Sequence, residues 1–164
     1  MAKTRTVRLI GICLIFLMSG CATGISRQAH SRVTYSGSFA QLQTAPDDHM
    51  GEVVMLGGMI IETKGSPTAS EITVLQLPLG RRDRPQEGDR SEGRYLIRSE
   101  QFLDPAIYQK GSQVTVVGRL RGSEVRSIGG FQYVYPLVEA IEIKLWPRAR
   151  RISPSVHFGV GVVF

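Results

Sequence analysis

The stretch from Glu52 to Glu62, EVVMLGGMIIE, constrains the fold of this chain most strongly. It is apolar at both alternating sets of positions and turn-forming residues flank it, which is typical of a strand buried on both sides. The paired glycines Gly57 and Gly58 would weaken a flat strand but suit a bulge or a sharp bend. A long first strand that bends at glycine and serves both halves of a small barrel is what an OB-fold requires.

Four further segments are predicted to be strands from alternation and β-branched composition. They are residues 71–79, 94–98, 113–121 and 131–146, the last with a bulge near residues 138–140. Polar stretches predict loops over residues 80–93 and 123–130.

Two short helices complete the predicted domain. Ser38 is placed to cap a helix that ends before Pro46, and Asp104-Pro105 is placed to start a second one. The order of three strands, a short helix and two strands predicts a mainly β fold, a five-stranded Greek-key OB-like barrel, over residues 39–146. A β-sandwich is the alternative, although it usually needs about seven strands.

The N-terminus carries a secretion signal. Lys3, Arg5 and Arg8 precede an apolar run over residues 9–18. This run is shorter than the roughly 20 residues that span a bilayer and fits the roughly 7–15 residues of a signal h-region. Residues 1–20 are therefore predicted to be a removed signal peptide.

Small residues then precede Cys21, and the site resembles the bacterial lipobox. Met18 stands where leucine is usual. The resemblance implies that Cys21 is acylated and becomes the mature N-terminus, a lipid attachment that holds the protein on a membrane. Because Ala22 is not aspartate, it also implies the outer membrane, with the domain facing the periplasm. An ordinary signal peptide that happens to contain a cysteine is the alternative. Residues 21–38 are interpreted as the lipidated N-terminus and a flexible tether.

Charge and cysteine count narrow the function classes. The net charge of +6 includes three basic residues of the signal, so 17 basic and 14 acidic residues leave +3 in the mature chain. This ordinary value argues against nucleic acid as a partner. Of the two cysteines, Cys13 leaves with the signal and Cys21 takes lipid. A cysteine nucleophile and a cysteine metal site are thereby excluded.

Asp47-Asp48-His49 is the one tight carboxylate–histidine group. Adjacent residues rarely converge on one metal, and His30 and His157 lie in the predicted tether and tail. A turn or helix-cap role is favoured over a metal or acid–base site. A Ser–His–Asp triad has no support without a nucleophile elbow. We expect no catalytic, cofactor or metal site and therefore a protein that is not an enzyme.

Three segments are candidate contact surfaces. The first is the loop over residues 80–93 with the residue that follows it, which together hold five arginines mixed with acidic residues. Such mixed charge is typical of a solvated, mobile loop. The alternative is that the arginines contact lipid head groups or lipopolysaccharide. Residues 147–164 form a basic and apolar tail with Arg148, Arg150 and Arg151, which is predicted to add an edge strand, pack on the domain, or touch the membrane or a partner. Tyr133 and Tyr135 share one strand face and could stack on a periplasmic glycan or peptide, although packing explains them equally well.

Several segments together resemble the Slp family of starvation-inducible outer-membrane lipoproteins. Besides the Cys21 site, these are PDDHMG leading into VVMLGG, GDRSEGR, FLDP, and Gly111 followed by VTVVG. The resemblance covers about residues 39–146. It implies an anchored cell-envelope domain that acts as a structural or interaction module in starvation, stationary-phase or acid stress, and it brings no catalytic residue. A tethered domain that binds glycan or peptide is the alternative.

Overall fold

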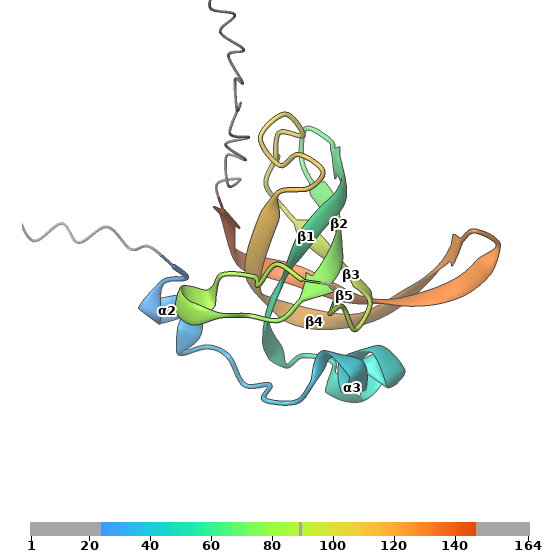
Figure 1. Ribbon diagram of the computed structural model, residues 1–164, viewed down its shortest axis with the longest axis horizontal. Helices are drawn as coiled ribbons and strands as arrows, with labels where there is room; N and C mark the ends of the chain where they lie inside the picture. Colours follow the sequence, from blue (N-terminus) through green and yellow to red (C-terminus); the bar gives the residue numbers. More distant parts are fainter. Residues whose placement is uncertain (1–23, 89, 147–164) are drawn as a thin grey trace, which may run out of the picture.

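The computed structural model describes residues 24–88 and 90–146. Five strands form a closed barrel in the order β1-β2-β3-β5-β4 (Figure 1). They are β1 (Val53–Gly65), β2 (Ser70–Leu77), β3 (Arg94–Ser99), β4 (Gln113–Ile128) and β5 (Phe131–Trp146). Neighbouring strands are antiparallel except β3 and β5, which are parallel. This is the strand order of an OB barrel, so the predicted fold class is confirmed and a sandwich is excluded.

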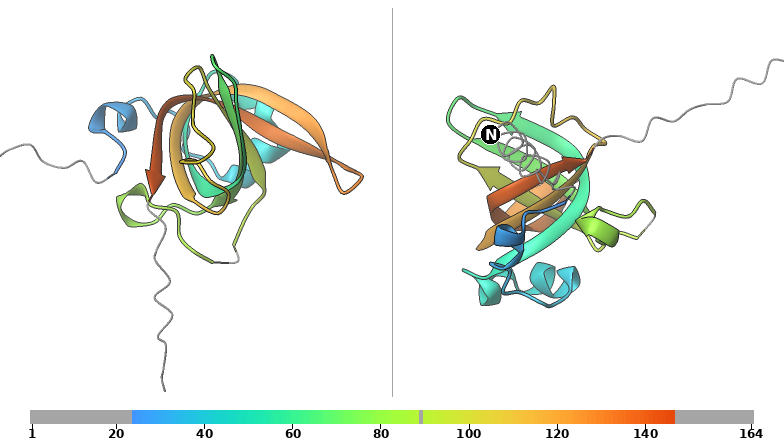
Figure 2. Two further views of the ribbon diagram at one scale, coloured as in Figure 1. Left: turned by 90° about the horizontal axis from the view of Figure 1, so that it is seen from above. Right: turned by 90° about the vertical axis from the view of Figure 1, so that its left-hand side faces the viewer.

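Four short helices accompany the strands in the described part of the chain. They are α2 (Arg27–His30), α3 (Phe39–Thr44) and the 3-10 helices η2 (Pro46–His49) and η3 (Arg81–Asp83). Figures 1 and 2 show α3 at one end of the barrel and α2 on its side.

β1 belongs to both halves of the barrel, as predicted. Its residues 53–59 pair with β4 and its residues 57–65 pair with β2. Of the bulge or sharp bend expected at the glycines, the bulge is not found there, because the register runs evenly through Gly57 and Gly58 and shifts between Ile60 and Glu62. A β-carbon on Gly58 would lie 2.2 Å from the carbonyl oxygen of Leu75, so this glycine permits close approach of β2 instead.

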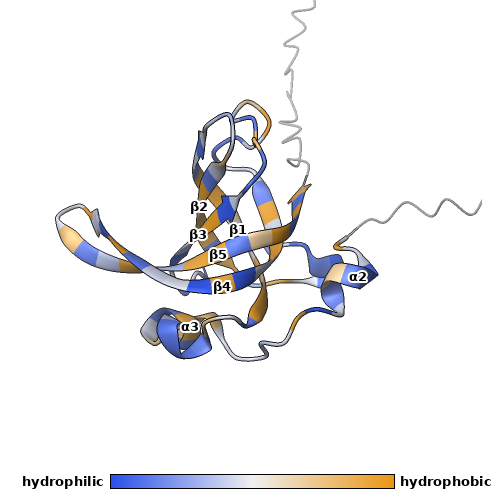
Figure 3. Cartoon of the chain, turned by 180° about the vertical axis from the view of Figure 1, so that it is seen from behind, coloured by the Kyte–Doolittle hydropathy of each residue, from blue (hydrophilic) through white to orange (hydrophobic). Residues whose placement is uncertain are grey.

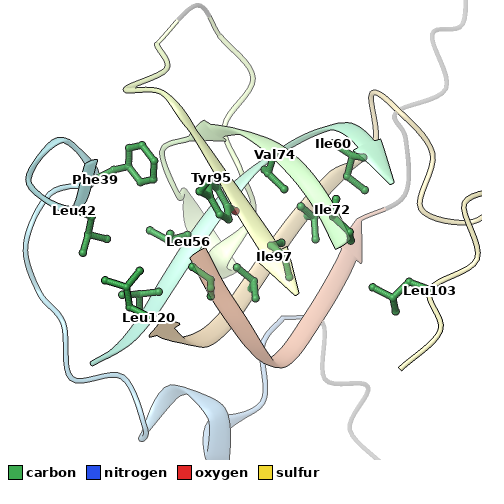
Figure 4. Close-up of a cluster of buried hydrophobic side chains, with 14 residues drawn as sticks. Phe39, Leu42, Leu56, Ile60, Ile72, Val74, Tyr95, Ile97, Leu103 and Leu120 are labelled. Atoms are coloured by element: carbon green, nitrogen blue, oxygen red, sulfur yellow. The ribbon is translucent and has the colours of Figure 1, made fainter. Parts of the chain in front are cut away.

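The core fills the barrel and continues under α3 (Figure 4). The ring of Phe39 packs at a 5.8 Å centroid distance from Tyr95 of β3. α3 forms where predicted because Ser38 and Gln41 make a reciprocal capping box, in which each side chain accepts from the other residue's amide. It ends at Thr44, before Pro46.

The predicted loop over residues 123–130 is wrong. β4 continues to Ile128, and a turn of two glycines with positive φ, Gly129 and Gly130, joins it to β5. Two such residues suit the tight hairpin turn. Residues 121–136 thus form a hairpin, here called the arm, which extends from the barrel in Figure 1. Figure 3 shows hydrophilic and apolar residues mixed along it. The register of β4 and β5 shifts between Glu142 and Ala140, adjoining the predicted bulge.

The predicted helix after Asp104 is also wrong, since the segment forms a turn. The Asp104 carboxylate accepts from the amide of Ala106, and its carbonyl accepts from the amides of Ile107 and Tyr108. The cap therefore exists, but Ile107 is 60% exposed, so no apolar face is buried to support further turns.

Candidate functional site: the face that carries the N-terminal segment

The described chain begins beside the predicted lipid attachment. Cys21 lies outside the described residues, three positions before Gly24. Arg148, Arg150, Arg151 and His157 of the predicted tail lie outside them as well. Where Gly24 is held on the barrel therefore determines which part of the domain is near Cys21.

α2 packs on the outside of the barrel. Ile25 and Ala29 are 7% and 3% exposed and pack with Val53 of β1 and Val117 of β4. The Ser26 side chain accepts from the amide of Ala29 and so caps the helix. Ile25 just before the helix and Ala29 within it thus attach one side of α2 to the barrel.

A carboxylate of β5 secures the start of α2. Glu142 accepts from the Ser26 amide at 2.9 Å, and its other oxygen accepts from the Ser26 hydroxyl. Hydrogen bonds to a charged acceptor each contribute roughly 1.5–3 kcal/mol to stability, and less where solvent reaches them. The contact joins residues that are 116 positions apart in sequence.

The segment after α2 is fastened to the start of β1. The carbonyl of Val53 accepts from the amides of Thr34 and Tyr35, and the Val53 amide donates to the Thr34 hydroxyl at 2.9 Å. The structure differs from the interpretation of residues 21–38 as a flexible tether within residues 25–35, where Ile25, Ala29, Thr34 and Tyr35 contact the barrel.

The loop after β2 lies against α2. Asp83 of η3 pairs with His30 at 2.7 Å, and a β-carbon on Gly24 would lie 3.1 Å from the Arg82 carbonyl oxygen. Arg82 and Asp83 both have positive φ, 58° and 61°, an uncommon conformation for residues other than glycine. Figure 2 shows α2 beside this loop.

A buried hydroxyl ties the loop to two strands. Thr115 of β4 donates to the Asp83 carbonyl at 2.6 Å and accepts from the indole N–H of Trp146 at 2.9 Å. Thr115 is fully buried. The interpretation of the whole arginine-rich loop as solvated and mobile thus fails at η3, which is held by these contacts and by the pair with His30.

Exposed basic side chains surround these contacts. We call the surface formed by α2, η3 and the end of β5 the N-terminal face; its exposed arginines without an ion pair to any described residue are Arg27, Arg32, Arg81 and Arg82. Arg84 and Lys144 lie over the Trp146 ring at 5.8 and 5.9 Å from its centroid. Sequence reasoning missed Arg27 and Arg32 because they fall in the supposed tether. Ser26, a helix cap next to apolar Ile25, was the available signal.

Asp47-Asp48-His49 forms η2, the predicted turn. His49 lies 2.9 Å from Glu52 and meets the Tyr35 ring edge-on at 4.9 Å. Burial and the nearby Glu52 carboxylate raise the pKa of Tyr35. Tyr35, His49 and Glu52 border an open groove of ≈ 650 Å³ beside α3. Within residues 24–88 and 90–146, no three His, Cys, Asp or Glu side chains are arranged to hold a metal ion.

Tyr133 and Tyr135 pack against the protein. They were the residues that could stack on a ligand. Tyr135 is 4% exposed and joins a small cluster with Leu96. The rings of Tyr133 and Tyr135 meet edge-on at 4.9 Å. The Tyr133 hydroxyl accepts from the Arg94 amide and from the Gln43 side chain. Of the two readings of this pair, the structure therefore supports packing.

Ion pairs hold the arm on the neighbouring strands. Arg126 of the arm donates two hydrogen bonds to Glu71 of β2, at 2.7 and 2.8 Å, and also pairs with Glu124. Arg98 of β3 pairs with both Glu71 and Glu124. The hydrogen bonds from Arg126 lower the pKa of Glu71, against the opposing effect of burial.

Comparisons with known proteins indicate one family of lipoproteins. A model of the outer membrane lipoprotein Slp family matches residues 18–160. An uncharacterized lipoprotein of Escherichia coli K12, YeaY, is 26% identical over 136 residues, which cover 83% of this chain and 70% of the relative. The outer membrane protein Slp of the same strain is 25% identical, covering 82% and 72%. An uncharacterized Haemophilus influenzae protein is 29% identical over 147 residues, covering 85% and 76%.

Solved structures show a more distant likeness. The chain is similar to a small single-stranded DNA-binding protein from Streptomyces coelicolor, with a TM-score of 0.40 and 11% identity over 58% of this chain and 94% of that one. It is also similar to the mitochondrial single-stranded DNA-binding protein Rim1 of S. cerevisiae, with a TM-score of 0.38 and 16% identity over 61% and 99%. At these values the likeness carries no information on what this chain binds.

Proposed function

Because this chain belongs to the outer membrane lipoprotein Slp family, we propose that it is anchored in the outer membrane through lipid on Cys21 and acts in the periplasm as a non-enzymatic structural or interaction module. Membrane association follows from the family, whereas the lipid on Cys21 and the orientation of the domain are our proposals. The family match carries the proposal because it begins at residue 18, includes the cysteine and continues through the barrel.

Several acyl chains would give this protein a stable attachment to the membrane. Within the described residues, the structure has no helix long and apolar enough to cross a bilayer. A single acyl chain binds a membrane only marginally, whereas two or more chains hold a protein stably. Acylation of Cys21 with several chains would supply that attachment.

The packing of the barrel face favours an interaction module over a ligand-binding domain. Tyr133 and Tyr135 were the candidate platform for a glycan or a peptide, and both are engaged in packing and hydrogen bonds. We further propose, from the family resemblance, that the module acts in starvation or envelope stress.

Replacing Cys21 tests the anchor. In Cys21→Ala, lipid cannot be attached, so the protein is expected to leave the outer-membrane fraction. Cys13→Ala is the matched control, since Cys13 lies in the predicted signal and its loss should leave fractionation unchanged. If Cys21→Ala still sediments with outer membranes at the wild-type level, lipid on this residue is not the anchor.

A further inference from the structure

We propose that the N-terminal face lies directly against the bilayer and that its arginines bind the phosphates of anionic phospholipid head groups. This inference rests on the proposed lipid on Cys21. It differs from the tether interpretation in a measurable way, because a flexible linker of 17 residues would give the domain a reach of roughly 20–25 Å and no fixed orientation.

The first argument is the length of chain between the lipid and the barrel. Cys21 is three positions before Gly24. Since an extended chain spans at most about 3.3–3.6 Å per residue, the α-carbon of Cys21 lies within roughly 11 Å of the α-carbon of Gly24. Gly24 is packed beside the Arg82 carbonyl, and Ile25 is buried on the barrel. The part of the domain next to the lipid is therefore this face.

The second argument is that the face has one orientation relative to its anchor. α2 is held by Glu142 through Ser26, and η3 is held to α2 by the pair between His30 and Asp83. Residue 24 therefore cannot swing away from the basic side chains without breaking these contacts. Figures 1 and 2 show α2 and the arm on opposite sides of the barrel, so the arm points away from the anchor.

The third argument is charge. Arg27, Arg32, Arg81 and Arg82 are exposed and form no ion pair with any described residue, while the acidic Asp83 and Glu142 of the same face are engaged by His30 and Ser26.

The arm provides the contrast. Its arginines Arg121 and Arg126 and the neighbouring Arg98 of β3 are each paired with glutamate. The N-terminal face thus presents four arginines that form no ion pair with any described residue, within reach of the lipid surface. Guanidinium groups match phosphate geometry, and a basic side chain near an anionic membrane strengthens binding about fivefold.

The test locates two sides of the barrel relative to the head groups. The full-length protein is purified from membranes and reconstituted in vesicles that contain about one quarter phosphatidylglycerol, or only zwitterionic lipid. A single cysteine for a fluorescent label is placed at Gln28 of α2 or at Ser127 of the arm, both exposed. Lipids that carry a nitroxide on the head group then quench labels that touch the surface. Mass spectrometry of the same samples reports lipid on Cys21.

The proposal predicts strong quenching of the label at Gln28 and weak quenching at Ser127 in anionic vesicles. The variant Arg27→Glu/Arg81→Glu should lower the ratio of membrane-contacting to free orientations by at least about 25-fold, from about fivefold for each lost basic side chain. It should have little effect on zwitterionic vesicles. The control Lys64→Glu/Lys110→Glu makes the same change in net charge at the end of β1 and on the segment between β3 and β4, and it should leave the quenching unchanged.

Each other outcome overturns a defined part. If Cys21 carries lipid but both labels are quenched equally or not at all, the fixed face is wrong and the anchor stands. If contact is equally strong on zwitterionic vesicles or survives charge reversal, anionic head groups are not what the face binds. If Cys21 carries no lipid, the anchor and the inference both fail.

Discussion

Packing of the N-terminal segment on the barrel predicts that one buried side chain controls its release. Ile25 is 7% exposed and packs with Val53 and Val117. Ile25→Ala removes most of that contact. Such a change in a core costs roughly 2–5 kcal/mol, and we expect about 2 kcal/mol here because the segment covers the surface and can adjust.

The assay is hydrogen exchange of the native protein, read in the peptide that contains α2 and the following residues. If the segment opens without the barrel, a loss of about 2 kcal/mol should accelerate its exchange about 30-fold, while the exchange of β4 remains unchanged. Ile107→Ala is the matched control, since it removes the same atoms from a residue that is 60% exposed, and it should change exchange in neither place.

Two results would refute this reasoning. Unprotected amides in α2 of the wild type would mean that residues 24–38 form a flexible tether after all. Equal acceleration in α2 and β4 would mean that the segment opens only with the whole barrel.

Further predictions concern three single side chains. The hydroxyl of Tyr95 is fully buried and has no hydrogen-bonding partner among the described residues, so Tyr95→Phe should raise the melting temperature; a lower one would mean that the hydroxyl has a partner. Burial also raises the pKa of Tyr95, so the side chain stays protonated in the folded protein while its unfolded form ionises above a pKa of about 10. Stability is therefore lost as the pH rises above that value, and this loss should be absent from the alkaline unfolding profile of Tyr95→Phe. Thr115→Val leaves the indole N–H of Trp146 without its acceptor and should cost about 1–3 kcal/mol in urea unfolding, whereas Thr115→Ser should retain most of the stability. Because Arg126 lowers the pKa of Glu71, that carboxylate stabilises the fold above its unfolded pKa and the contribution is lost as the pH falls towards the lowered value; the acid-induced drop in melting temperature should therefore be smaller in Glu71→Gln.

The parts of the fold that could be predicted have strong local signals. The run from Glu52 shows a strand because its apolar residues are continuous, and Phe131–Trp146 shows one by β-branching. Ser38 and Gln41 carry the capping box of α3 within four residues. In each case neighbouring residues alone determine the local structure, and the barrel then buries it.

The parts that could not be predicted depend on residues far apart in sequence. The end of β4 is polar, and its Arg126 is neutralised by Glu71 from another strand. The docking of α2 depends on Glu142, which is 116 positions from Ser26. At Asp104 the local pattern predicted a helix that does not form. The local cap is present, but the residues after it have no core to cover. Local patterns therefore located the strands and missed the face beside the proposed anchor.

The central claim is that lipid on one sulfur atom holds this barrel on the outer membrane. Intact mass spectrometry of the mature protein, extracted from membranes with detergent, tests it most directly. We predict a chain that begins at Cys21 and whose N-terminal peptide carries the added mass of a diacylglyceryl group and an amide-linked acyl chain. A mature chain that begins at another residue, or an unmodified Cys21, would contradict the account.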